Sequence, residues 1–158
     1  MPHLNEDSRV SRSFVQRIEA APELVFPLLC PVREREWLPG WDCRMIFSRS
    51  GMAERGAVFE TAHVGGATVW LMTEYVPSRR VEFARWQPDG LVVQIEIALG
   101  RHHDDATAVC IAYTYTAISD HGLTALALLG EGDWLRTMEF WQQSMNTWFR
   151  RQPTEKTD

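Results

Sequence analysis

The sequence predicts an α+β domain in which an antiparallel sheet is followed by a long helix. Between residues 44 and 118, apolar side chains recur at every second position in short segments that turn-forming residues separate, a pattern typical of an antiparallel meander. From residue 133 onward, the apolar side chains recur every three or four positions, as they do on one face of a helix. Helices that are segregated from an antiparallel sheet define the α+β class.

The first expected elements are one strand and two short helices. Residues 13–19 (SFVQRIE) predict the strand, with its apolar side chains on one face. Pro22 suits the first turn of a short helix, and Pro31 ends this helix because the residue before a proline avoids the helical conformation. Residues 33–37 (REREW) predict the second short helix, which stops before Pro39.

Six segments with a two-residue period make up the meander. The alternation is clearest in residues 91–99, where every odd-numbered position holds Leu, Val or Ile. Gly65-Gly66 and Pro88-Asp89-Gly90 are strong turn signals, and tight turns join neighbouring antiparallel strands. The expected strands are residues 44–49, 56–62, 68–76, 80–86, 91–99 and 107–118.

The last expected element is a long amphipathic helix that follows residues 120–122 and runs to Arg151, with Asp120 or Asp133 as the residue that caps its start. A Gly-Glu-Gly sequence that begins at Gly130 kinks this element or divides it. We expect one domain, residues 10–151, between flexible tails at residues 1–9 and 152–158. The apolar stripe of the helix consists of Trp134, Leu135, Met138, Trp141, Met145, Trp148 and Phe149.

Several short motifs occur in a distinctive order along residues 12–150. They are RIEAAPELVF at residues 17–26, WLPGWD at 37–42, GAVFET at 56–61, WLMTEYVP at 70–77 with Arg79-Arg80-Val81 after it, TYTA at 114–117, and Gly122 followed by the Trp-containing helix to Phe149. No motif is specific alone, but their order resembles the SRPBCC superfamily, with its START-like, pollen-allergen-like and polyketide-cyclase-like branches, and in particular a bacterial single-domain member. The resemblance implies the helix-grip fold, a seven-stranded antiparallel sheet wrapped around the C-terminal helix, with two short helices between strands 1 and 2.

Composition and charge exclude several kinds of protein. The chain has 158 residues, of which 45% are hydrophobic, and this is enough for the core of one domain. Sixteen basic and 21 acidic residues give a net charge of −5, which argues against a nucleic-acid-binding surface. No apolar run is long enough for membrane insertion, and the N-terminal residues do not predict a secretory signal.

Cysteine spacing and the lack of nucleotide motifs predict a cytoplasmic protein without a cofactor. Cys30, Cys43 and Cys110 form no CxxC pair, so we expect reduced thiols and no zinc site. The run His102-His103-Asp104-Asp105 has metal-capable side chains, but adjacent residues in a turn point apart and do not predict a metal site. The sequence also contains no glycine-rich loop of the kind that binds nucleotides.

Bulky side chains on surfaces expected to face each other predict a cavity between the sheet and the last helix. Such a cavity suits a small hydrophobic or aromatic ligand. Trp37 and Trp41, in the loop after the second short helix, either form a lid over one end of the cavity or plug the core there. The other members line the cavity or pack between sheet and helix. The expected ligand-binding residues are Trp37, Trp41, Phe59, Trp70, Met72, Met138, Trp141 and Met145.

Three polar side chains within the apolar strands are candidate catalytic residues: Glu74, Arg85 and Tyr115. If Trp70 and Met72 face inward, Glu74 follows them in a regular strand, and Arg85 is then its nearest partner. Such a pair orients a polar ligand head or transfers a proton, and the phenol of Tyr115 donates a hydrogen bond to a ligand carbonyl. In the alternative interpretation, Glu74 lies on a solvated outer face and Tyr115 packs in the core.

The leading hypothesis is a protein that binds a small hydrophobic or aromatic molecule, such as a lipid or a polyketide-like metabolite. The first alternative is an enzyme of the cyclase, dehydratase or hydrolase kind that uses the same pocket and needs an ionisable group inside it. The second is a co-chaperone-like interaction module, which a large exposed apolar patch would favour. The resemblance allows all three, because fold alone does not decide function. No residue pattern predicts or excludes a homodimer.

Overall fold

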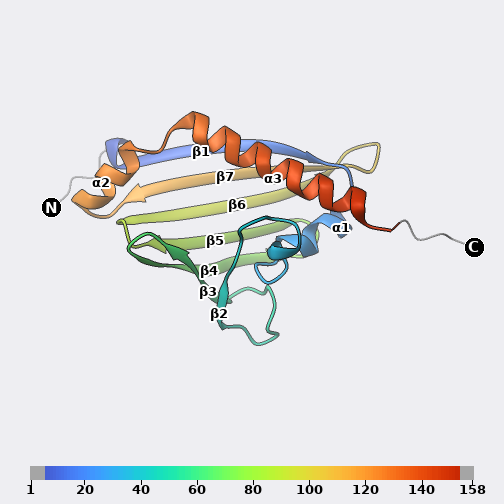
Figure 1. Ribbon diagram of the computed structural model, residues 1–158, viewed down its shortest axis with the longest axis horizontal. Coiled ribbons are helices and arrows are strands. Elements are labelled where there is room, and N and C mark those ends of the chain that lie inside the picture. Colours follow the sequence, from blue (N-terminus) through green and yellow to red (C-terminus); the bar gives the residue numbers. More distant parts are fainter. Residues whose placement is uncertain (1–5, 154–158) are drawn as a thin grey trace, which may run out of the picture.

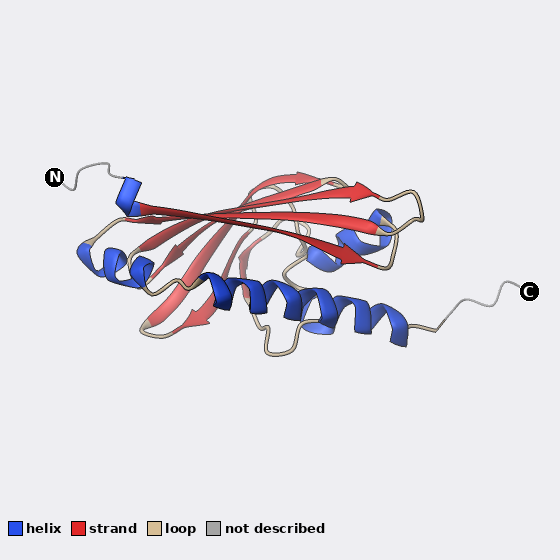
Figure 2. Cartoon of the chain, turned by 90° about the horizontal axis from the view of Figure 1, so that it is seen from above, coloured by secondary structure: helices blue, strands red, loops and turns tan. Residues whose placement is uncertain are grey.

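Seven antiparallel strands form one open, twisted sheet with a long helix along one face, which we call the inner face (Figures 1 and 2). The strands are β1 Arg9–Ile18, β2 Arg44–Phe47, β3 Val58–His63, β4 Gly66–Val76, β5 Arg80–Gln87, β6 Leu91–Arg101 and β7 Thr107–Ala117. The computed structural model describes residues 6–153. The strands pair in the order β1-β7-β6-β5-β4-β3-β2, so the first and last strands of the chain lie side by side.

The helices lie where the sequence predicts them. The short helices fall between β1 and β2, and the predicted C-terminal helix is divided at Gly130, which caps its longer part. The predicted helix-grip fold is therefore confirmed. The helices are α1 Pro22–Val25 continued by a 3-10 turn at Phe26–Leu29, a second 3-10 turn at Glu34–Glu36, α2 Asp120–Ala127 and α3 Glu131–Arg151.

Polar side chains of α3 cover the open edge of β1. The Oε1 atom of Gln142 accepts a hydrogen bond from the backbone N–H of Arg17 at 2.9 Å. Asn146 accepts from the backbone N–H of Glu19 at 2.8 Å and donates to the carbonyl of Arg17 at 2.9 Å. Because β1 is an edge strand, these backbone groups have no neighbouring strand to pair with. The helix therefore lies beside β1, and the segment between α1 and β2 covers the inner face further along the sheet (Figure 1).

Close backbone contact holds α2 against the turn between β5 and β6. A Cβ atom at Gly122 would lie 2.0 Å from the carbonyl oxygen of Gly90, so this position requires glycine. The N–H of Ile118 donates to the same oxygen at 2.9 Å, and the hydroxyl of Ser119 caps the helix by accepting from the N–H of Gly122. This contact places residues 128–130, which follow α2, at the rim of a pocket described below.

The ends of the described chain differ from the expected tails. Residues Glu6–Ser8 form a 3-10 turn and Arg9 opens β1, so structure begins before residue 10. The rest of the expected tails, residues 1–5 and 154–158, lies outside the described residues. Within residues 6–153, no helix has both the length and the apolar character needed to cross a membrane.

Candidate functional site

Aromatic side chains enclose a cavity of about 40 Å³, the inner cavity, beneath the segment between α1 and β2. At roughly 15 Å³ per water molecule, this volume holds about two or three waters. With the side chains in these positions it is too small for an organic ligand. Five of the predicted ligand-binding residues line it: Trp37, Trp41, Phe59, Trp70 and Trp141.

The aromatic rings around Trp70 form one packed cluster. Phe59 stacks on the indole of Trp70 with ring centroids 5.2 Å apart and an interplanar angle of 18°. Phe83 and Trp41 meet the same indole edge-on, at 5.8 Å and 5.9 Å. Each such pair contributes about 0.5–1.5 kcal/mol beyond the burial of its area. The sheet side of the inner cavity is therefore a rigid wall.

Trp37 and Trp41 are both held by hydrogen bonds from their indole N–H groups. Trp37 donates to the carbonyl of Leu28 at 2.7 Å, and Trp41 donates to the carbonyl of Pro31 at 2.9 Å. Trp37 is buried, whereas Trp41 is half-buried at the edge of the cavity. Trp37 therefore packs in the core and Trp41 borders the cavity, and a lid function for either residue stays a prediction.

A larger pocket of about 260 Å³, the outer pocket, opens between the first turns of α3 and the inner face at β5 and β7. Tyr113 and Trp141 line both cavities, so these two side chains separate the outer pocket from the inner cavity. Met138 lines the outer pocket, whereas Met72 and Met145 are buried in the core and line neither cavity. The polar lining residues of the outer pocket are Arg12, Arg85, Tyr113, Tyr115, Asp133 and Thr137.

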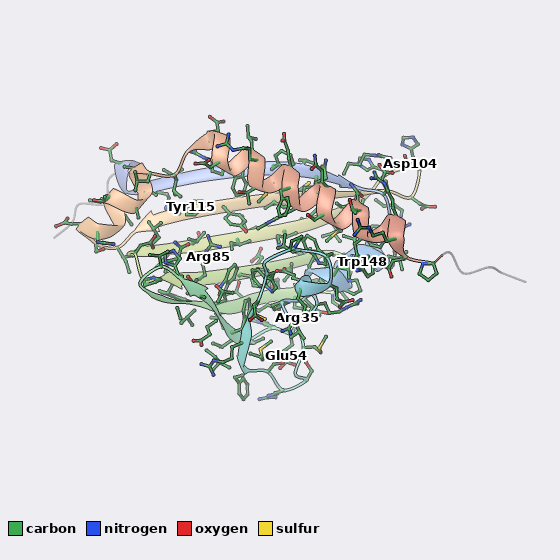
Figure 3. The ribbon with its side chains drawn as sticks, in the orientation of Figure 1. Arg35, Glu54, Arg85, Asp104, Tyr115 and Trp148 are labelled. Carbon is green, nitrogen blue, oxygen red and sulfur yellow. The ribbon has the colours of Figure 1, made fainter. Side chains whose placement is uncertain are left out.

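Arg85 lies on the inner face, as its candidate role requires. Its guanidinium carbon is 4.9 Å from the ring centroid of Trp70 and 5.4 Å from that of Tyr113. Contacts of this kind stabilise a cation by about 0.5–2 kcal/mol. Its Nε atom donates to Gln87 at 2.9 Å. Figure 3 shows Arg85 near Tyr115, at the end of the sheet where α3 begins.

The phenols of Tyr113 and Tyr115 remain protonated hydrogen-bond donors. Burial raises the pKa of both groups above its ordinary value, although the neighbouring guanidinium of Arg85 opposes the shift. Tyr115 is 8% exposed, so its ring packs in the core while its hydroxyl reaches the outer pocket. The core packing expected in the alternative interpretation is therefore present, and a hydrogen bond from Tyr115 to a ligand stays a prediction.

A β-bulge in β4 places Glu74 on the outer face of the sheet. Met72 pairs with Phe83 on the inner face, but the register then shifts, and Glu74 pairs with Glu82. Glu82 belongs to the outer face, where it accepts a hydrogen bond from Arg80. The expectation that Glu74 follows Met72 inward and pairs with Arg85 is therefore wrong, because the extra residue at the bulge reverses the alternation.

Glu34 and Arg12 are site residues that the sequence did not reveal. The carboxyl of the half-buried Glu34 lines the inner cavity, and burial raises its pKa to about 8. Arg12 lies on the inner face of β1 and lines the outer pocket. Phe14, two residues further on, shares that face, so extending the period-two pattern by one residue would have found Arg12. No comparable signal marks Glu34, which is one of three consecutive charged residues after Arg33.

The turn at residues 102–105 contains side chains that can bind metals, but its two carboxylates form ion pairs with arginines. Asp104 pairs with Arg17, and Asp105 pairs with Arg101 (Figure 3 labels Asp104). Within the part of the chain that the structure describes, no three His, Cys, Asp or Glu side chains are grouped closely enough to hold a metal ion.

Known structures share the fold of this chain at low sequence identity. An uncharacterized protein from Rhizobium leguminosarum is 14% identical, with a TM-score of 0.66 over 91% of this chain and 96% of the other. Ara h 8.0201 is 10% identical, with a TM-score of 0.64 over 91% of this chain and 99% of that protein. DynU16, a protein from the dynemicin biosynthetic locus, is 15% identical, with a TM-score of 0.59 over 89% of this chain and 48% of its own. No protein-family model and no curated protein matches the chain. Likeness at these identities establishes the fold alone.

Proposed function

We propose that this protein binds a small hydrophobic or aromatic molecule, lipid-like or polyketide-like, between the sheet and α3. The observation that carries the proposal is that the outer pocket and the inner cavity share Tyr113 and Trp141 as lining residues, so the two spaces lie next to each other. A ligand of about two fused rings fits the outer pocket, and rotation of the half-buried Trp141 extends that space inward. The fold supports the proposal, since one structural neighbour, DynU16, comes from a biosynthetic locus.

Membership of the SRPBCC superfamily and a cytoplasmic location belong to the same proposal. The motif order and the helix-grip fold support the first. The second is supported by the thiols of Cys30, Cys43 and Cys110, which are all free.

Native mass spectrometry and calorimetry test the proposal. The purified chain is weighed under native conditions and again after denaturation and extraction, and a co-purifying organic molecule of defined mass is the expected result. In parallel, the protein is titrated with 2-naphthol, a neutral two-ring probe that fits the outer pocket, and saturable heat of binding is expected. A clean apo mass together with no binding of 2-naphthol or of its anionic counterpart 2-naphthoate would contradict the proposal.

A second candidate function is acid catalysis on the bound molecule, and Glu34 favours it. A carboxyl with a pKa near 8 is protonated at neutral pH, so it can donate a proton to an oxygen of a ligand that reaches the inner cavity. Dehydration of a β-hydroxyketone is a suitable test. Glu34 would protonate the departing hydroxyl, which leaves as water, while solvent takes the α-proton and a conjugated enone forms.

The assay follows the dehydration of 4-(anthracen-2-yl)-4-hydroxybutan-2-one, a three-ring β-hydroxyketone long enough to extend past Trp141 toward Glu34, by the ultraviolet absorbance of the enone. Turnover that decreases as pH rises through about 8, and that Glu34→Gln abolishes, is the expected result. Turnover that survives this substitution would exclude Glu34 as the acid. The co-chaperone-like interaction module stays a prediction from the resemblance.

A further inference from the structure

Two guanidinium groups line the outer pocket without a carboxylate partner. Neither Arg12 nor Arg85 forms an ion pair within the part of the chain that the structure describes. Arg12 donates only to the backbone carbonyls of Ser11 and Leu129, both at 3.3 Å, and Arg85 donates to the neutral side chain of Gln87. The pocket therefore carries uncompensated positive charge on its walls.

The Nε atom of Arg12 makes this arrangement unusual. It is buried and has no hydrogen-bond partner among the described residues. A buried charged donor that lacks an acceptor destabilises the fold unless a ligand supplies the acceptor. By contrast, Arg80, which lies on the outer face of β5, forms ion pairs with the carboxylates of Glu82 and Glu96. The missing acceptor at Arg12 thus points to a ligand atom.

Strand register brings the donors of the outer pocket to one place. Arg85 pairs with Val93, and Val93 pairs with Tyr115 on the far side, so the small Val93 side chain lies between the two longer ones. Burial, the larger effect, raises the pKa of the Tyr115 phenol, and the positive charges of Arg85 and Arg12 both lower it. Tyr115 is therefore the neutral donor that lies between the two cations.

Asp133 is the one acidic residue on the wall of the outer pocket, and it does not neutralise these cations. Its carboxylate is exposed and pairs with Arg136, one turn further along α3. Glu34 lies beyond the partition, in the inner cavity. The pocket therefore retains its net positive character. Apolar side chains of Trp134, Met138 and Trp141 cover the wall opposite to the sheet.

We infer that the outer pocket binds the carboxylate of an aromatic or otherwise apolar acid, with Arg85 and Arg12 as the groups that hold it. The planar guanidinium binds a carboxylate by donating two parallel hydrogen bonds to its oxygens, an arrangement that a lone hydroxyl does not reproduce. Tyr115 donates to the same carboxylate, and the apolar body of the ligand lies against Trp134 and Trp141. This inference rests on the proposed function, whose ligand it specifies as an anionic one.

Calorimetric titration of the full chain with 2-naphthoate and 2-naphthol tests the inference. The two probes share the same rings and differ in the anionic group, so we expect 2-naphthoate to bind at least about tenfold more tightly. Its affinity is also expected to decrease between about 50 and 500 mM salt, while that of 2-naphthol does not. Acetate at the same concentrations is expected not to bind, because it lacks the apolar body.

Arg85→Gln and Arg12→Gln are each expected to reduce 2-naphthoate affinity about tenfold and to reduce 2-naphthol affinity by a much smaller factor. The matched control is Arg80→Gln, on the same strand as Arg85 but on the outer face, which is expected to change neither affinity. Thermal unfolding identifies any variant that does not fold, and the comparison of the two probes on the wild type needs no variant.

The outcomes separate the inference from the function on which it rests. Equal affinity of the wild type for both probes, or equal loss of both in Arg85→Gln, overturns the inference and leaves the proposed function standing. Binding of neither probe by the wild type overturns both.

Discussion

Replacing Glu34 with glutamine is expected to make the protein more stable at neutral pH. The pKa of Glu34 is 4.5 in a model peptide and about 8 in the folded protein, so between these values the folded state holds one more proton than the unfolded state. The free energy of unfolding therefore decreases as pH rises, by about 1.4 kcal/mol per pH unit for this group. From pH 4.5 to pH 7, the loss reaches at most about 3 kcal/mol, because the half-buried carboxyl is partly screened by water. Glu34→Gln removes this loss.

Urea unfolding followed by tryptophan fluorescence measures the effect. At pH 7 the midpoint of Glu34→Gln is expected to lie up to about 1–2 M urea above that of the wild type, and at pH 4.5 the two midpoints are expected to coincide. Glu36→Gln is the matched control, because the Glu36 carboxylate accepts a hydrogen bond from Arg33 that lowers its pKa. The control is expected not to gain stability at pH 7. A difference between Glu34→Gln and the wild type that is the same at pH 4.5 and pH 8 would show that the carboxyl is ionised in the folded protein and would refute the reasoning.

Three further substitutions distinguish the walls of the two cavities. Trp141→Ala removes half of the partition, so the three-ring probe anthracene-2-carboxylate is expected to bind more tightly than to the wild type in calorimetry, while 2-naphthoate changes little. Met72→Ala is expected to reduce the free energy of unfolding in urea by about 2–5 kcal/mol, because the side chain is fully buried, and to leave 2-naphthoate affinity unchanged. Glu74→Gln is expected to keep 2-naphthoate affinity within about twofold, and a loss of about tenfold or more would contradict its place on the outer face.

Local patterns predicted nearly all of the strands but not how the sheet is ordered. The alternation in residues 91–99 appears as β6, whose odd-numbered positions up to Ile97 are buried. The pairing of β1 with β7 joins residues about a hundred positions apart, and no local pattern encodes it. The resemblance to the SRPBCC superfamily predicted a seven-stranded antiparallel sheet around the C-terminal helix, but the order of the strands was not predicted.

The candidate site was less predictable than the fold. For two of its features, a difference of one residue in a strand decides whether a side chain is assigned to the inner face. Thr73 and Glu74 fit a regular strand as well as a bulged one, and no glycine marks the bulge that turns Glu74 outward. Arg12 was missed because the strand was expected to begin at residue 13, whereas β1 begins at Arg9. Only the packing of the segment between α1 and β2 turns Glu34 toward the inner cavity.

The two proposed activities require ligands of different length. A two-ring acid held by Arg85 and Arg12 fills the outer pocket and stops at Tyr113 and Trp141, so it does not reach Glu34. Only a longer ligand, whose far end displaces Trp141, places an oxygen beside the protonated carboxyl. Binding without turnover for short acids, and turnover confined to long ones, is thus what this geometry implies if both proposals hold. A short acid that is turned over would require a proton donor in the outer pocket, and there the buried phenol of Tyr115 is the group to replace first.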